Sequence, residues 1–236
     1  MRRLIENLGF LLLINLISKP LWLLAEQEVQ DRLGHATWGT FAALLSLGFL
    51  LRPVGELGIA QYTIKTIAGE QRYYNSLFGR ALLLNLWLNV LYLGVTLGVG
   101  WLLGYRGEWL LILTLVALFY VVLNFLEQFR AGLQAFQQFK ADGIASITDK
   151  TLMMLILLLM FSGGWLTLRG FAVASLLTML LSMLAFGAVV FIKFGLPTLK
   201  LSRLRTAHLL RKSWPFALMV VLFCTNERIN QLMLER

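Results

Sequence analysis

Long apolar runs separated by short polar stretches dominate the chain. They occupy residues 4–24, 38–57, 81–103, 109–126, 144–161, 170–192 and 215–234. Each run approaches the roughly 20 residues that an α-helix needs to cross about 30 Å of hydrocarbon. Residues 152–161 are apolar all round, without the alternation typical of strands in a membrane barrel. The pattern predicts an all-α membrane protein, a polytopic helical bundle with about seven transmembrane helices.

Composition excludes several other classes of protein. The 236 residues are 58% hydrophobic and only 14% charged, which leaves too little polar surface for a soluble domain. The net charge of +9 predicts a basic membrane surface that contacts lipid, not a nucleic-acid partner, because no soluble basic face remains. Cys224 is the single cysteine, and His35 and His208 are predicted on opposite sides of the membrane. We therefore expect no metal site, no cofactor and no enzymatic centre.

The distribution of Lys and Arg predicts the orientation in the membrane. One set of alternate connections holds most of these residues, whereas the other set holds only Arg32, Arg106 and Arg169. Short basic connections stay in the cytoplasm, so we expect a multi-pass protein of the cytoplasmic (inner) membrane with a cytoplasmic N-terminus. Short Gly-containing turns at residues 104–108 and 162–169 predict that the helices on either side are antiparallel neighbours.

An amphipathic segment follows the fourth apolar run. Phe125, Phe129, Leu133, Phe136 and Phe139 recur at steps of three and four residues, with polar and charged residues between them. We interpret this segment as a helix anchored among lipid headgroups at the cytoplasmic interface, in preference to a partner-binding helix.

Ionisable residues inside the apolar runs are the candidate functional residues, because a charge in hydrocarbon is costly. Arg52 and Glu56 lie four residues apart in the second run, close enough to pair on one helix face. Mutual neutralisation and a functional role explain this pair equally well. Lys19 lies near the outer end of the first run.

Further polar residues lie in the last and the third runs. Glu227, Arg228 and Asn230 make the last run the most polar one, which is expected of a helix that lines a water-filled space. Asn85 and Asn89 share a face of the third run, and amides in membrane helices most often bridge neighbouring helices.

Several short motifs carry a resemblance to a known family. Residues 32–39 read RLGHATWG, and residues 56–59, at the end of the second run, read ELGI. Residues 136–140 read FQQFK, and residues 214–218, which open the last run, read WPFAL. In this order the motifs resemble flippases for polysaccharides and lipid-linked oligosaccharides, within the multidrug, oligosaccharidyl-lipid and polysaccharide exporter superfamily.

The resemblance implies one half of a two-bundle protein, because members usually have two similar bundles around a central cavity. Residues 1–212 are then a six-helix N-terminal bundle with a basic cytoplasmic linker at residues 193–212. Residues 213–236 are the seventh transmembrane helix and the start of a second bundle. A second half-bundle or glycan-assembly enzymes are the expected protein partners.

The resemblance also implies a function and roles for the buried charges. The expected activity is the flipping of a polyprenyl-diphosphate-linked oligosaccharide to the outer leaflet for cell-surface polysaccharide biosynthesis, without enzymatic chemistry. The candidate substrate-binding residues are Lys19, Arg52 and Arg228. The candidate charge-balancing or ion-coupling residues are Glu56, Glu227 and Asn230. At Asn230 the family often has Asp.

Two other functions stay open at this point. One is a multidrug exporter of the same superfamily, although the excess of basic over acidic groups in the predicted helices argues weakly against cationic cargo. The other is a truncated membrane scaffold that does not transport and associates with glycan-assembly enzymes.

Overall fold

The computed structural model describes residue 20, residues 23–199 and residues 203–234. Within these ranges the side chains of residues 71, 139–140, 142, 144–150, 203–205 and 227–234 are not described. All described residues belong to helices or to the connections between helices. The predicted all-helical class is confirmed.

The helices follow one another with short connections. The first described helix covers residues 23–33. The others are α2 (His35–Leu51), α3 (Pro53–Glu56), α4 (Ile59–Gly69), α5 (Gly79–Leu102), α6 (Glu108–Ala135), α7 (Phe139–Gly163), α8 (Leu168–Phe194) and α9 (Arg203–Leu234). Two short turns precede α5, namely η1 (Gln71–Tyr73) and η2 (Tyr74–Phe78).

Several of these helices are long and apolar enough to cross a membrane. The five candidate spans are His35–Glu56, Tyr74–Leu102, Glu108–Ala135, Leu168–Phe194 and Thr206–Asn226. The predicted count of about seven is not confirmed. Nearly all of the run at residues 4–24 lies outside the described residues, and α7 supplies only the shorter apolar segment Thr151–Gly163. The described residues thus have the helices of a multi-pass membrane protein.

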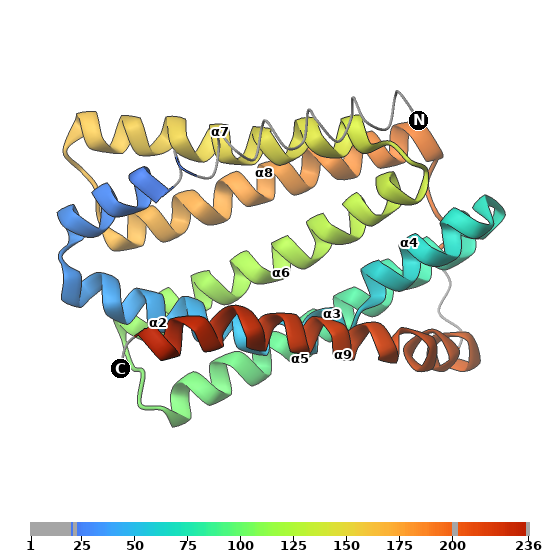
Figure 1. Cartoon of the computed structure of the whole chain (residues 1–236), viewed down its shortest axis with the longest axis horizontal. Coiled ribbons are helices and arrows are strands. Elements are labelled where there is room, and N and C mark those ends of the chain that lie inside the picture. Colours follow the sequence, from blue (N-terminus) through green and yellow to red (C-terminus); the bar gives the residue numbers. More distant parts are fainter. Residues whose placement is uncertain (1–19, 21–22, 200–202, 235–236) are drawn as a thin grey trace.

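Helix α6 lies at the centre of the bundle. It packs against α2, α4, α5, α7 and α8, and Figure 1 shows it crossing the middle of the molecule. Helices α5 and α6 are neighbours joined by a tight turn, as are α7 and α8. Both expected antiparallel pairs are confirmed. Side chains on the different faces of α6 can therefore contact side chains from most of the other described helices.

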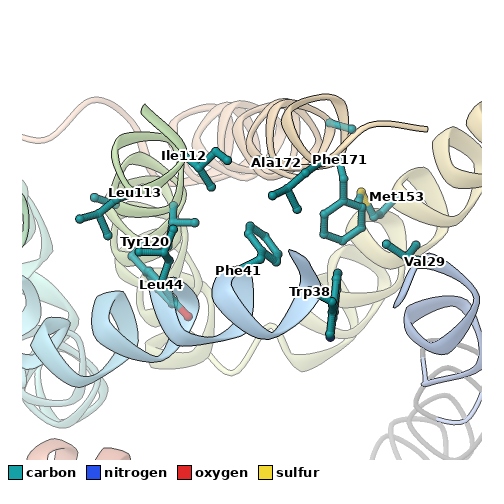
Figure 2. Close-up of a cluster of buried hydrophobic side chains, with 14 of the residues drawn as sticks. Val29, Trp38, Phe41, Leu44, Ile112, Leu113, Tyr120, Met153, Phe171 and Ala172 are labelled. Carbon is teal, nitrogen blue, oxygen red and sulfur yellow. The ribbon is translucent and has the colours of Figure 1, made fainter. Parts of the chain in front are cut away.

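The first half of α6 borders an aromatic and aliphatic core. Figure 2 shows Phe41 of α2 between α6 and the side chains of Trp38 and Phe171. The Trp38 and Phe171 ring centroids lie 5.4 Å and 5.7 Å, respectively, from that of Phe41. This core joins α2, α6, α7 and α8 at the end of the bundle where α2 begins.

The amphipathic segment after residue 125 has a different role from the one expected. It continues α6 without a break to Ala135. Phe129 packs against Phe78 and Phe191, and the Phe136 ring stacks on Phe194 at 4.0 Å. Its apolar face is therefore covered by protein, and the interpretation as a helix anchored in headgroups is wrong. A periodic apolar face shows that something covers it, but not whether lipid or protein does.

The second predicted run ends at its expected boundary, and a further helix follows it. Leu57 and Gly58 both adopt left-handed conformations, with φ of 44° and 68°, which end α3 and allow α4 to start at Ile59. A Cβ atom on Gly58 would lie 2.5 Å from the backbone of α9 at Phe216 and Ala217. Only glycine combines this φ with this contact.

Helix α9 begins earlier than the apolar pattern indicated. It starts at Arg203, so residues 203–212 of the expected basic linker are helical, and Pro215 lies inside the helix. Proline has no N–H for the carbonyl four residues earlier, but membrane helices tolerate it where neighbouring helices support the backbone. Helices α2, α3 and α4 pack against α9 and give this support.

We expect Gly58→Ala to destabilise the protein by about 1–3 kcal/mol, because the substitution adds strain at positive φ and a clash with α9. Thermal unfolding of the purified protein in detergent measures this effect. Gly39→Ala in α2 is the matched control, because a Cβ atom there meets nothing within 4 Å. It should leave the melting temperature unchanged or raise it. An unchanged melting temperature for Gly58→Ala would contradict the close packing described here.

Candidate functional site

A cluster of buried polar and charged side chains lies where α2, α3, α5 and α6 meet. Arg52, between α2 and α3, is its cation, and Glu56 ends α3. Asn89 lies near the middle of the span Tyr74–Leu102, and Asn124 lies near the middle of Glu108–Ala135. The cluster is therefore within the hydrocarbon depth of these spans, where each charge needs a partner.

Arg52 contacts both carboxylates of the cluster. Its Nη2 atom lies 3.4 Å from Glu56 Oε2 and also pairs with the carboxylate of Glu127 on α6. Its Nε atom donates a hydrogen bond of 2.9 Å to Asn124 Oδ1. The side chains of Arg52 and Glu56 are only 11% and 5% exposed, whereas that of Glu127 is 31% exposed. The guanidinium is thus held from two helices inside the bundle.

Three asparagines connect the ion pairs to α5. Asn124 Nδ2 donates to Asn89 Oδ1 at 2.8 Å, and Asn89 Nδ2 donates to the Asn85 carbonyl oxygen at 2.8 Å. Asn85 Nδ2 donates back to the Asn124 carbonyl oxygen at 3.3 Å. The prediction that Asn85 and Asn89 bridge helices is confirmed. These bonds fix the depth of α5 relative to α6.

Gly55 makes this convergence sterically possible. A Cβ atom at residue 55 would lie 2.8 Å from Asn124 Nδ2 and 2.9 Å from Asn89 Oδ1. Because Gly55 has no side chain, both asparagines can approach the backbone of α3. The residues between Arg52 and Glu56 thus allow the ion pair and the amides to share one small volume.

The cluster contains more acidic than basic side chains. Two carboxylates, Glu56 and Glu127, face the single guanidinium of Arg52. Glu56 Oε1 is buried and has no hydrogen-bond donor among the described residues. Gln128 Oε1, one residue after Glu127, is also buried without a donor within that same part of the chain. Unsatisfied buried acceptors are unusual and mark a site that can take up a donor.

The structure brings two of the six predicted site residues together. Arg52 and Glu56 form the expected pair four residues apart. Lys19 lies outside the described residues, as do the side chains of Glu227, Arg228 and Asn230. Helix α9 nevertheless lies beside the cluster, because it packs against α2 and α3, the two helices on either side of Arg52.

Glu127 and Asn124 were not predicted to be site residues, although the sequence contains a signal for them. Asn124, Glu127 and Gln128 are spaced by three and four residues, which places them on one helix face. Asn85 and Asn89 have the same property. Two polar faces at similar depth in neighbouring predicted helices would have indicated a shared site.

An apolar cavity of about 300 Å³ lies in the other half of the bundle, near the start of α2. Trp38, Phe41 and Phe171 line it, as does Met153 of α7 (Figure 2). In the described part of the chain, no three His, Cys, Asp or Glu side chains come together as a metal site. The charged cluster is therefore the stronger candidate for polar chemistry.

Comparison with known proteins assigns the family. Residues 4–236 match the family described as polysaccharide biosynthesis protein. The chain belongs to this family. Polysaccharide biosynthesis proteins are part of the polysaccharide and multidrug exporter superfamily of flippases, so the resemblance found in the sequence is confirmed. Members of the family are generally transporters rather than enzymes. Neither a curated protein nor a solved structure matches the chain.

In this polysaccharide biosynthesis protein we expect Arg52→Gln to lower the free energy of unfolding by about 3 kcal/mol, because the buried carboxylate of Glu56 and the partly buried one of Glu127 lose their cation. The triple variant Arg52→Gln, Glu56→Gln, Glu127→Gln should lose less, since it leaves no unpaired charge. Thermal or denaturant unfolding in detergent compares the two variants.

The control for charge removal is Arg169→Gln. Arg169 Nε pairs with Glu108 Oε1 at 2.8 Å, also between two helices, but both side chains are more than half exposed. Its loss should change stability by less than about 1 kcal/mol. A triple variant less stable than Arg52→Gln alone would contradict the charge-pairing explanation.

Proposed function

We propose that this protein forms a bundle of a flippase. Its cargo would be a polyprenyl-diphosphate-linked oligosaccharide, moved from the inner to the outer leaflet of the cytoplasmic membrane for cell-surface polysaccharide biosynthesis. The observation that carries the proposal is the buried cation Arg52, held between Glu56 and Glu127 inside the bundle. The family indicates the class of cargo, and the cluster offers the chemistry that this cargo requires.

A diphosphate can cross hydrocarbon only if its charge is compensated. The planar guanidinium of Arg52 suits this role, because its N–H groups bind phosphate oxygens in pairs. In the structure, Glu56 and Glu127 accept this cation. Phosphate oxygens would replace a carboxylate as the partner of Arg52, so its charge would stay paired before and after loading.

Residues beyond the described cluster extend the proposal. Lys19 and Arg228 would supply further positive charge for the diphosphate. Glu227 and Asn230 would join Glu56 in balancing charge or coupling an ion. Residues 227, 228 and 230 belong to α9, which packs against α2 and α3 on either side of Arg52, and this packing supports a place for them near the cluster.

The proposed organisation of the whole protein follows the sequence expectation. The run at residues 4–24 and helix α7 would be further crossings, for seven in all, with the N-terminus in the cytoplasm. Residues 1–212 would form a six-helix bundle, and α9 would begin a second bundle. A second half-bundle or glycan-assembly enzymes would complete the machinery. The excess of Lys and Arg at one set of helix ends supports this orientation.

A transport assay tests the proposal. We expect Arg52→Ala to reduce flipping of a fluorescently labelled lipid-linked oligosaccharide in membrane vesicles by at least about tenfold, because charge-assisted bonds to the diphosphate are lost. Lys19→Ala and Arg228→Ala should also reduce it. Arg52→Lys should keep partial activity, since it retains the charge but not the paired donors.

Arg106→Ala is the control for this assay. Arg106 lies in the turn between α5 and α6 and donates to the backbone carbonyls of Trp101 and Tyr105, far from the cluster along α5. The Arg106→Ala variant should flip the labelled oligosaccharide at the wild-type rate. Unchanged rates in Arg52→Ala, Lys19→Ala and Arg228→Ala would reject these residue roles. Efflux of organic cations, without any flipping of lipid-linked oligosaccharide, would instead identify a multidrug exporter.

A further inference from the structure

A second pocket, separate from the apolar cavity and from the Arg52 cluster, lies at the end of the bundle where α5 and α9 begin. Its volume is about 310 Å³. Tyr62 and Thr66 of α4 form one wall, Tyr73 and Arg80 form another, and His208 of α9 completes it. Three segments that are distant in sequence therefore surround one space.

The polar groups in the lining of this pocket can bind anions, and Leu77 and Leu209 supply its apolar part. Arg80 contributes a guanidinium, His208 an imidazole, and Tyr62, Tyr73 and Thr66 contribute hydroxyl groups. None of the described lining residues is an acid. Arg80 Nε donates to the carbonyl oxygen of Ser76, and this bond holds the Nε end of the guanidinium near the start of α5.

Two more cations lie near residues that line the pocket or contact its lining. The Arg72 guanidinium lies 5.4 Å from the ring centroid of Tyr73, and the Lys65 Nζ atom lies 5.7 Å from that of Phe216, whose ring neighbours Tyr62. Glu70, the acid nearest in sequence to Tyr73, already accepts a 2.6 Å hydrogen bond from Arg72. Arg72 and Glu70 therefore neutralise each other, and Arg80 and Lys65 are the other cations near this pocket.

The depth of the pocket matches that of lipid headgroups. The span Tyr74–Leu102 has 29 residues and so measures roughly 43 Å at 1.5 Å per residue. This exceeds the hydrocarbon thickness of about 30 Å, so the ends of the span reach the headgroup layer. Arg80 lies near the start of this span, and His208 lies near the start of Thr206–Asn226.

We infer that this pocket binds a phosphate group, and that an anionic phospholipid headgroup supplies it. Arg80 and His208 contact the phosphate oxygens, and the Tyr62 and Tyr73 hydroxyls donate hydrogen bonds to them, whereas the Thr66 hydroxyl already donates to the Tyr62 carbonyl oxygen. The bound headgroup joins α4, α5 and α9, because each of these helices contributes a ligand. Basic pockets between membrane helices bind anionic headgroups in this way. The inference does not depend on which cargo the protein transports at the Arg52 cluster.

Native mass spectrometry of the purified full chain in detergent tests this inference. We expect phosphatidylglycerol to bind at least about tenfold more tightly than phosphatidylcholine, and Arg80→Gln to remove most of this preference. His208→Gln and Tyr73→Phe should each weaken binding several-fold. Both residues are exposed, so these two variants still report on the site if Arg80→Gln does not fold.

Arg106→Gln is the matched control, because it removes one positive charge from the opposite end of α5. It should keep the preference for phosphatidylglycerol. A second arm titrates inorganic phosphate and measures the melting temperature. Stabilisation that requires Arg80, without any preference for phosphatidylglycerol, would assign the pocket to soluble phosphate. Equal lipid binding by the wild type and all pocket variants, or equal loss in Arg106→Gln, would overturn the inference.

Discussion

The arrangement of the bundle depends on keeping Arg52 paired inside hydrocarbon. The N–H groups of a guanidinium at this depth require hydrogen-bond acceptors. Helices α2 and α3 supply only one acidic side chain for it, Glu56. Glu127 and Asn124 supply the others, so α6 must lie beside the break between α2 and α3. The asparagine bonds then set the position of α5. One buried charge thus constrains four segments.

Local features of the sequence were predictable, and contacts between distant segments were not. Arg52 and Glu56 pair because they are one helical turn apart, and this spacing can be read from the sequence. Glu127 joins them only because α2 and α6 pack at one particular register. Apolar residues on both helices would allow several registers, and spacing within one run does not choose among them.

Two further differences also have a physical origin. The apolar stripe through Phe129 has the period of a helix at a membrane surface, but Phe78 and Phe191 cover it. Which partner covers an apolar face depends on the three-dimensional path of the chain. Helix α4 escaped prediction because residues 59–69 mix polar and apolar side chains and follow directly on a long apolar run.

The contact between Gly58 and α9 couples the position of α9 to the end of α3, next to the Arg52 cluster. The Gly58 backbone touches that of Phe216 and Ala217 so closely that no methyl group fits between them. Tilting or sliding α9 must therefore push on the turn that ends α3, and Glu56 is the last residue of α3. Rigid interiors transmit such displacements without absorbing them. A displacement of α9 would therefore also displace Glu56 relative to Arg52.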